Sequence, residues 1–173
     1  MVLETTPRNW YRGEYLVSTE PQLIQVEAVN AAMDSDLMWW AQGLPGAEIK
    51  KALHNSLCLG LYVLPEATSQ IAGQGGPRQV GLVRLVTDDV TFAYLTDVYI
   101  LPEHQGKGLG RWLMECLDEV IKGWAHLRRF MLLVSDKMDF YRKHLGAKDW
   151  SECNTAAISI GLIEGPAVKR PEH

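Results

Sequence analysis

Residues 98–110 read VYILPEHQGKGLG, and this stretch says most about the fold of the chain. An apolar run rich in β-forming residues stops at Pro102, and a turn with three glycines (Gly106, Gly108 and Gly110) leads into a strongly amphipathic helix. Such a turn presents consecutive backbone N–H groups, to which the helix dipole adds partial positive charge. Glycine is needed because a Cβ would hold a phosphate away from the backbone or restrict φ. The stretch therefore predicts a pyrophosphate-binding site.

The spacing of these glycines excludes two common nucleotide-binding motifs. A P-loop has four residues between its first glycine and Gly-Lys-Ser/Thr, and no Ser or Thr follows Lys107. The dinucleotide fingerprint GxGxxG is not met either, because the three glycines read GxGxG. A tight strand-to-helix connection without a ligand would explain glycine here, but it gives no reason for three glycines in so short a turn.

The same stretch resembles the acetyl-CoA-binding motif of the GNAT acetyltransferases, Arg/Gln-x-x-Gly-x-Gly/Ala after a strand ending Val-x-Pro. Gln105, Gly108 and Gly110 occupy the motif positions, while Ile100 and Pro102 supply the strand end. The resemblance implies acetyl-CoA as cosubstrate and no metal. In this family the acetyl-pantetheine arm lies in a wedge of the sheet and bonds to the strand backbone. The cosubstrate-binding residues implied are Val98, Tyr99, Ile100, Gln105, Gly106, Lys107, Gly108, Leu109, Gly110, Arg111 and Asp136.

Three of these residues carry side-chain hypotheses. Lys107 and Arg111 are expected to help neutralise the phosphates, because Gln105 lacks the charge of the family's more usual arginine; a solvated surface is the alternative for Lys107. Asp136 is expected to bind the pantetheine or the substrate, and its simpler interpretation is a helix N-cap.

The order of predicted elements supports the same family. Strands are expected at 15–19, 56–63, 79–87, 91–101 and 130–134, with weaker ones at 148–150 and 156–160. Helices are expected at 21–33, 47–54, 109–124 and 136–144. This order resembles the GNAT fold, an α/β fold whose mixed, mostly antiparallel sheet splits into a wedge flanked by about four helices. The residues Trp39-Trp40-Ala41, Asn55-Ser56-Leu57 and Leu95-x-Asp97 further resemble small GNAT proteins of unassigned substrate.

Composition indicates one globular domain over residues 1–163 and a polar tail, 164–173, that is expected to be disordered. The 173 residues carry a net charge of −4 and no basic run, which argues against nucleic acid as a partner. No apolar run approaches the roughly 20 residues of a membrane span, and the N-terminus does not look like a leader. Three scattered cysteines, Cys58, Cys116 and Cys153, argue for a reducing compartment, so we expect a cytoplasmic protein.

Acetyl transfer from a thioester needs a neutral amine, a stabilised carbonyl oxygen and a proton for the departing thiolate. The candidate acid is Tyr141, because GNAT proteins commonly place a tyrosine here in a pattern Tyr-x-x-x-Gly-Phe. This chain departs from that pattern: one extra residue precedes Gly146, and Ala147 replaces the aromatic residue. The neighbouring Phe140 has no proton to donate. The alternative role for Tyr141 is core packing with its hydroxyl at the edge.

The general base is less defined. Asp97 lies on the strand that lines the wedge, and strand alternation places its side chain opposite Val98 and Ile100. Its alternative role is an ion pair with Arg84 or a bond to a backbone amide. His104 could shuttle a proton, lie over the phosphate or lie in solvent, and a reaction without any protein base also remains open.

Trp39 and Trp40 fall in the segment that covers the acceptor side in this fold, where they would line the substrate pocket or pack in the core. The predicted function is therefore an acetyl-CoA-dependent N-acetyltransferase that acts on a primary amine by direct attack in a ternary complex. A small molecule is favoured over a protein as the carrier of that amine. The alternatives are a non-catalytic acyl-CoA-binding module and a protein or peptide N-acetyltransferase. Either a monomer or a homodimer fits the sequence.

Overall fold

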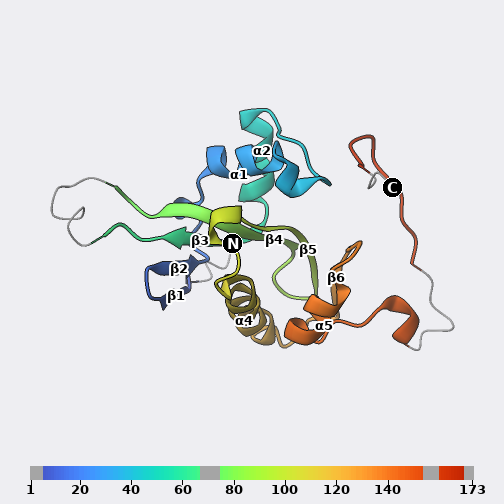
Figure 1. Cartoon of the computed structure of the whole chain (residues 1–173). Helices are drawn as coiled ribbons and strands as arrows, with labels where there is room; N and C mark the ends of the chain where they lie inside the picture. Colours follow the sequence, from blue (N-terminus) through green and yellow to red (C-terminus); the bar gives the residue numbers. More distant parts are fainter. Residues whose placement is uncertain (1–5, 67–74, 154–159, 170–173) are drawn as a thin grey trace.

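The computed structural model describes residues 6–66, 75–153 and 160–169, which fold around one six-stranded sheet (Figure 1). The strands follow one another across the sheet in chain order; β1 to β5 are antiparallel neighbours, whereas β5 and β6 run parallel. The predicted α/β fold with a mostly antiparallel sheet is confirmed. The strands are β1 (Asn9–Arg12), β2 (Tyr15–Ser18), β3 (Leu57–Val63), β4 (Arg78–Thr87), β5 (Phe92–Ile100) and β6 (Arg129–Leu132).

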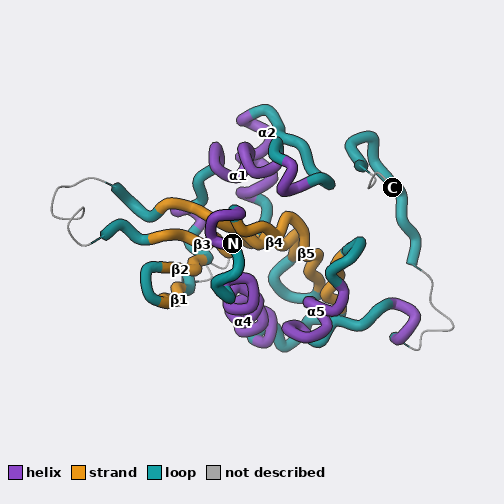
Figure 2. Tube along the Cα trace, viewed as in Figure 1, coloured by secondary structure: helices purple, strands orange, loops and turns teal. Residues whose placement is uncertain are grey.

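Helices cover both faces of the sheet (Figure 2). One face carries α1 (Val26–Met33) and α2 (Gly46–His54), with the short 3-10 helices η1 (Pro21–Leu23) and η2 (Asp36–Met38) beside them. The opposite face carries α4 (Leu109–Lys122) and α5 (Met138–Leu145). Each face has its own apolar core, and α4 buries Leu113, Met114 and Leu117 against the sheet. Because each such side chain contributes about 1.5–3 kcal/mol when buried, this packing holds the start of α4 in place.

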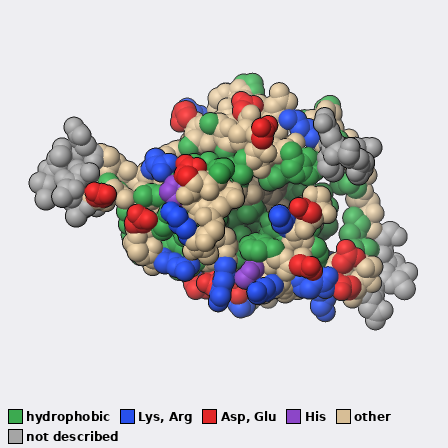
Figure 3. All heavy atoms as spheres, viewed as in Figure 1, with side chains coloured by type: hydrophobic (Ala, Val, Ile, Leu, Met, Phe, Trp, Pro, Cys, Tyr) green, Lys and Arg blue, Asp and Glu red, His purple; other side chains and the backbone are tan. Residues whose placement is uncertain are grey.

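The sheet opens into a wedge between β5 and β6. These strands pair over four residues only, from Phe92 opposite Arg129 to Leu95 opposite Leu132. Beyond Leu95, β5 continues to Ile100 without a partner on that side among the described residues. In Figure 3, hydrophobic side chains line a recess at the middle of the molecule, between the α1/α2 layer and the α4/α5 layer. The predicted split of the sheet is therefore present.

A β-bulge at Asp97 lies where the wedge begins. Arg84 of β4 pairs with Thr96, but Leu82 pairs with Tyr99, so β5 carries one extra residue here. Asp97 has φ +47°, in the left-handed region that non-glycine residues seldom occupy. The extra residue reverses the alternation: Leu95 and Val98 both pack on the α4 face, while Asp97 turns toward Trp40 on the α1/α2 face. The prediction that Asp97 and Val98 face opposite ways is confirmed, and bulges of this kind are frequent beside active sites.

Several local predictions need correction. The predicted helix over 21–33 is interrupted, because Ile24 and Gln25 are extended and α1 begins only at Val26. The predicted strand over 130–134 ends at Leu132, and Leu133 is 63% exposed. A first strand, β1, was not predicted, although Gly13 forms a hairpin turn after it with φ +58°.

The predicted strand at 148–150 is instead the 3-10 helix η4 (Trp150–Glu152). Asp149 and Glu152 form a reciprocal capping box, and this local bonding outweighs a weak strand pattern. Of the other weak strand, 156–159 lie outside the described residues, and Ile160 is not in a strand. No helix in the described ranges is long and apolar enough to cross a bilayer.

Candidate active site

The glycine turn presents a row of unused backbone donors. Gly106 and Gly108 have φ +75° and +73°, so both need the left-handed freedom of glycine. A Cβ built at Gly106 would meet nothing within 4 Å, which leaves the turn open on that side. The six N–H groups from Gly106 to Arg111 donate to no other atom of the described chain. Six free donors at the start of a 14-residue helix form a site suited to a pyrophosphate.

Basic side chains surround this turn. Lys107 donates to the Tyr15 hydroxyl at 3.1 Å, which raises its pKa, and Arg111 is paired with Glu115 at 2.7 Å. Sequence reasoning missed Arg12, whose guanidinium lies over the Trp112 ring and 3.5 Å from the Gly108 carbonyl oxygen. The hairpin signal of Gly13 would have predicted the strand that carries Arg12, but only the tertiary structure places that strand beside the glycine turn. The side chains of Arg12, Lys107 and Arg111 together place positive charge around the turn.

His104 supports the turn from behind. The residue is only 8% exposed, so its predicted position in solvent is corrected. Nδ1 lies 3.0 Å from the Tyr15 hydroxyl and Nε2 lies 3.1 Å from Arg78. Because Arg78 can only donate, Nε2 must accept, and the ring proton lies on Nδ1. Burial and the charges of Arg78 and Lys107 lower the pKa of His104, which keeps the ring neutral.

Inside the wedge, Gln105 and Phe140 lie against the end of β5. The Gln105 side chain donates to the Ile100 carbonyl oxygen at 2.8 Å and so fixes the strand to the turn. A Cβ built at Gly110 would lie 3.7 Å from the tip of the Phe140 ring and 3.8 Å from Ile100. Glycine at position 110 therefore leaves space at the point where α4, α5 and β5 meet.

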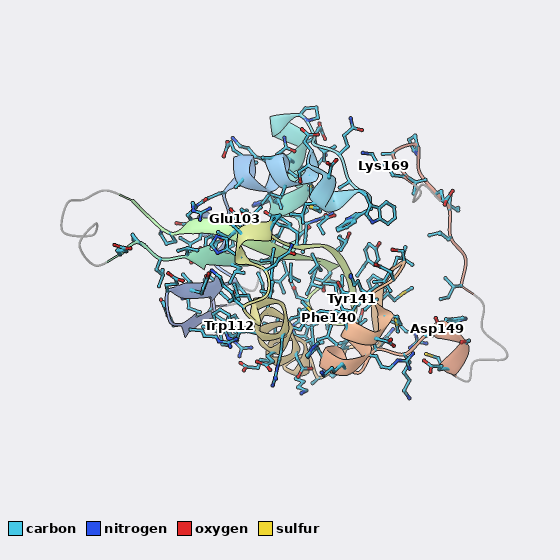
Figure 4. All side chains as sticks on the ribbon, viewed as in Figure 1. Glu103, Trp112, Phe140, Tyr141, Asp149 and Lys169 are labelled. Atoms are coloured by element: carbon cyan, nitrogen blue, oxygen red, sulfur yellow. The ribbon has the colours of Figure 1, made fainter. Side chains whose placement is uncertain are left out.

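Tyr141 extends from α5 into the same region (Figure 4). Its side chain is buried in the α4-side core, its ring meets Phe140 edge-on, and burial raises the pKa of its hydroxyl. That hydroxyl has no hydrogen-bond partner among the described residues, yet it is not fully enclosed as the Tyr62 hydroxyl is. The phenol is therefore protonated at neutral pH and free to donate.

Asp97 is held in a buried ion pair, one of the two arrangements that the sequence left open. One carboxylate oxygen accepts from two Arg84 nitrogens, at 2.6 and 2.7 Å. The other oxygen accepts from Trp40 Nε1 at 3.3 Å and from the Thr96 hydroxyl at 3.4 Å. Arg84 also donates to the Ser56 hydroxyl at 3.0 Å. Asp97 thus links β4 and β5 to the segment that carries Trp40.

Trp39 and Trp40 were expected either to line a pocket or to pack in the core, and the structure shows one in each position. Trp40 is half-buried against the α1/α2 core, whereas Trp39 is 41% exposed and meets Trp40 edge-on at 5.9 Å between ring centroids. Trp39 lines a cavity of about 910 Å³ that also reaches Ser135, just beyond β6. The cavity therefore lies between the segment that carries Trp39 and the segment that follows β6, and we call it the acceptor-side cavity because the sequence predicts an acceptor site at Trp39. It is lined by Met33, Asp34, Ser35, Asp36, Met38, Trp39, Ala41, Gln42, Ser135 and Lys169.

Asp136 follows Ser135 at the mouth of the wedge. The predicted N-cap role is corrected: α5 begins at Met138 after Lys137, and no side chain among the described residues caps it. The Asp136 carboxylate is exposed and lies 3.7 Å from the Lys137 ammonium. It is accessible to a ligand at the wedge.

Comparison with known proteins identifies this arrangement. Residues 36–147 match the family model described as the acetyltransferase (GNAT) family. A protein of Gibberella zeae, whose name gives acetyltransferase as a provisional assignment, is 51% identical over 98% of this chain and 99% of its own length.

Solved structures agree. A crystal structure from Xanthomonas campestris pv. campestris, provisionally assigned as an acetyltransferase of the GNAT family, has a TM-score of 0.70 and 29% identity, and the match covers 91% of this chain and 99% of that chain. The GNAT family protein SP0256 from Streptococcus pneumoniae shares the fold, with a TM-score of 0.55 and 20% identity over 92% of this chain and 97% of that chain.

Proposed function

Because this chain belongs to the GNAT family of acetyltransferases, we propose that it transfers the acetyl group of acetyl-CoA to a primary amine of a small molecule, by direct attack in a ternary complex. The observation that carries this proposal is the row of six free N–H groups that follows β5 at the open end of a split sheet. Holding the donor beside the acceptor in a fixed wedge supplies proximity, which alone lowers the barrier by up to about 7–11 kcal/mol.

The glycine turn fits the cosubstrate. Its N–H groups from Gly106 to Arg111 suit the pyrophosphate, with Lys107, Arg111 and Arg12 adding positive charge. The free edge of β5 at Val98, Tyr99 and Ile100 offers backbone groups to the pantetheine arm, although the Ile100 carbonyl is already bonded to Gln105. Acetyl-CoA supplies the acetyl thioester when bound.

Tyr141 is proposed as the acid that protonates the departing thiolate. A raised pKa keeps its hydroxyl protonated, and the absence of a partner among the described residues leaves the proton available. On α5 its ring meets that of Phe140 edge-on, and Phe140 in turn approaches Gly110 of α4 and Ile100 of β5. The extra residue before Gly146 is accommodated by the left-handed C-cap of α5, with φ +69°.

Asp97 is proposed to hold Trp40 in position and not to act as the general base. A general base needs a free lone pair directed at the amine, and both oxygens of Asp97 already accept hydrogen bonds. The same bonds fix Trp40 and, through edge-on contact, Trp39 in the wall of the acceptor-side cavity. Water can then carry the proton of the attacking amine.

A small-molecule acceptor fits the acceptor-side cavity, which has a volume of about 910 Å³. Pockets of roughly 300–1,000 Å³ are typical of small-molecule sites. The carboxylates of Asp34 and Asp36 in its lining favour a cationic amine. The buried free thiols of Cys58 and Cys116 fit the reducing cytoplasm that we propose as its location.

The decisive experiment measures thiol release from acetyl-CoA in the presence of separate panels of small amines and of peptides. Release that depends on a small amine supports the proposal. Binding of CoA, seen by calorimetry, without release under any amine would identify a non-catalytic acyl-CoA-binding module. Release with peptides alone would identify a peptide N-acetyltransferase instead.

A further inference from the structure

The acceptor-side cavity already holds a primary ammonium group, and this group belongs to the chain itself. The Nζ atom of Lys169 donates a 2.8 Å hydrogen bond to the carbonyl oxygen of Ala41, 128 residues away in sequence. Lys169 thereby lines the cavity together with Trp39 and Ser135. In Figure 4, Lys169 lies on the C-terminal segment, on the side of the molecule that carries α1 and α2.

The remainder of the lining suits an aliphatic cation. Trp39, which is 41% exposed, offers aromatic surface to a methylene chain, and the buried side chains of Met33 and Met38 support the apolar wall behind it. Asp34 uses one oxygen to accept from the Gly43 N–H at 2.8 Å, which fixes the loop. Asp36 is exposed, and its side chain forms no hydrogen bond or ion pair with any other described residue. The cavity thus combines a carbonyl that binds an ammonium group with a free carboxylate and an apolar wall.

We propose that the acceptor-side cavity binds a linear aliphatic diamine, and that Lys169 is an internal occupant that this ligand displaces. The inference deepens the proposed function and rests on it only for the fate of the second amine. One end of the diamine stays protonated and takes the place of the Lys169 ammonium at the Ala41 carbonyl, in the field of Asp36. The other end, uncharged, reaches toward the wedge between Trp39 and Ser135.

An internal occupant lowers the apparent affinity for a ligand to the intrinsic affinity multiplied by the fraction of molecules in which the cavity is free. If Lys169 occupies the cavity about 90% of the time, removing its side chain strengthens diamine binding by about tenfold. The residues around it, 160–168, are exposed, so the substitution leaves the apolar cores untouched.

The test is calorimetry with 1,4-diaminobutane, without acetyl-CoA, on the full-length protein and on the variants Lys169→Ala and Lys148→Ala. Lys148 is an exposed lysine outside the cavity, so its replacement makes the same change in net charge. We expect Lys169→Ala to bind about tenfold more tightly than the unmodified protein, and Lys148→Ala to be unchanged. Butylamine, which has the same chain length but lacks the second amino group, should bind several-fold more weakly because its far end can form no hydrogen bond at the wedge. Asp36→Asn should weaken diamine binding by about fivefold, as expected for loss of one exposed charge pair.

Equal affinities for Lys169→Ala and the unmodified protein would overturn the inference, as would equal gains in both lysine variants, which would reflect net charge alone. The result is separable from the acetyl-transfer proposal. Tighter binding in Lys169→Ala without thiol release would keep the diamine site and remove the transferase proposal. Thiol release with amines, but no effect of Lys169→Ala on diamine binding, would do the reverse.

Discussion

The proposed donor side and the proposed acceptor side of this site are built in different ways. The donor side is one continuous stretch, from Ile100 to Arg111, whose working groups are backbone N–H donors at a helix start. The acceptor side joins three distant segments through side chains: the loop around Trp39 and Trp40, the Arg84–Asp97 pair and the residues near Lys169. A backbone site depends on local conformation, whereas a side-chain site depends on long-range contacts, so substitutions should affect the two sides differently.

Gly108→Asp should give the largest effect, because it breaks the donor side at its backbone. The substitution forces a side chain into φ +73° and places a negative charge against the proposed pyrophosphate. Acetyl-CoA binding measured by calorimetry should fall by at least about 100-fold, the cost of a few kcal/mol of strain and repulsion. Gly76→Asp is the matched control, since a Cβ there meets nothing within 4 Å and its φ is not positive. Undiminished binding in a folded Gly108→Asp protein would remove the donor site.

Tyr141→Phe should leave the donor side intact while it slows the chemistry. Acetyl-CoA affinity should stay within about twofold, and turnover should fall by about 10²–10⁴-fold, the usual contribution of a positioned proton donor. Tyr11→Phe removes a hydroxyl from a tyrosine that is 68% exposed and should change neither quantity. If single-turnover rates of Tyr141→Phe match those of the unmodified protein, Tyr141 only packs in the core.

Asp97→Asn should have a smaller effect on rate and a clear effect on stability. Arg84 would lose its charged partner in a pair whose side chains are only 18% and 7% exposed, and the free energy of unfolding should fall by about 3 kcal/mol. With Trp40 less well held, KM for the amine should rise about tenfold, the effect of about 1.4 kcal/mol, while kcat changes less. Asp139→Asn, at an exposed position of α5, is the control.

The pH–rate profile of Asp97→Asn distinguishes the two roles of Asp97. A positioning role leaves the shape of the profile unchanged. A general base would instead give a rate loss that is greatest at low pH, where few amines are already neutral. A loss of rate that is greatest at low pH would identify Asp97 as the general base and would contradict its assignment as a positioning residue of the acceptor side.

His104→Gln should have the smallest effect of these substitutions, a change in how the free energy of unfolding depends on pH below neutrality. Because the folded pKa of His104 lies below its usual value near 6.5, the unfolded chain binds a proton more readily. The stabilisation from neutral His104 is therefore fully present above about pH 6.5 and is lost as the pH falls through the folded pKa. One proton limits the slope to about 1.4 kcal/mol per pH unit. In urea unfolding between pH 7 and 5, the free energy of unfolding should decrease less steeply with falling pH for His104→Gln than for the unmodified protein. An identical pH dependence in the two proteins would show that other groups cause the acid sensitivity.

Local sequence was sufficient wherever the signal lay in the backbone. The glycine turn, the buried face of α4 and the antiparallel strands β3 to β5 could be predicted, because glycine, helical periodicity and apolar runs act within a few residues. The same reasoning failed for η4, where a capping box outweighed a weak strand pattern, and for β6, which ends before Leu133. At η4 the local hydrogen bonds of the capping box determined the structure, and after Leu132 the chain leaves the sheet and Leu133 is exposed.

The sequence by itself determined the family of the fold, the donor turn and the residue types that could carry the chemistry. Only the tertiary structure decided which of those residues meet. It joined Asp97 to Arg84 and Trp40, buried His104 between Tyr15 and Arg78, and brought Lys169 to Ala41. The physical reason is that hydrogen bonds and ion pairs between distant segments depend on how the two faces of the sheet are packed, and no local pattern encodes that packing.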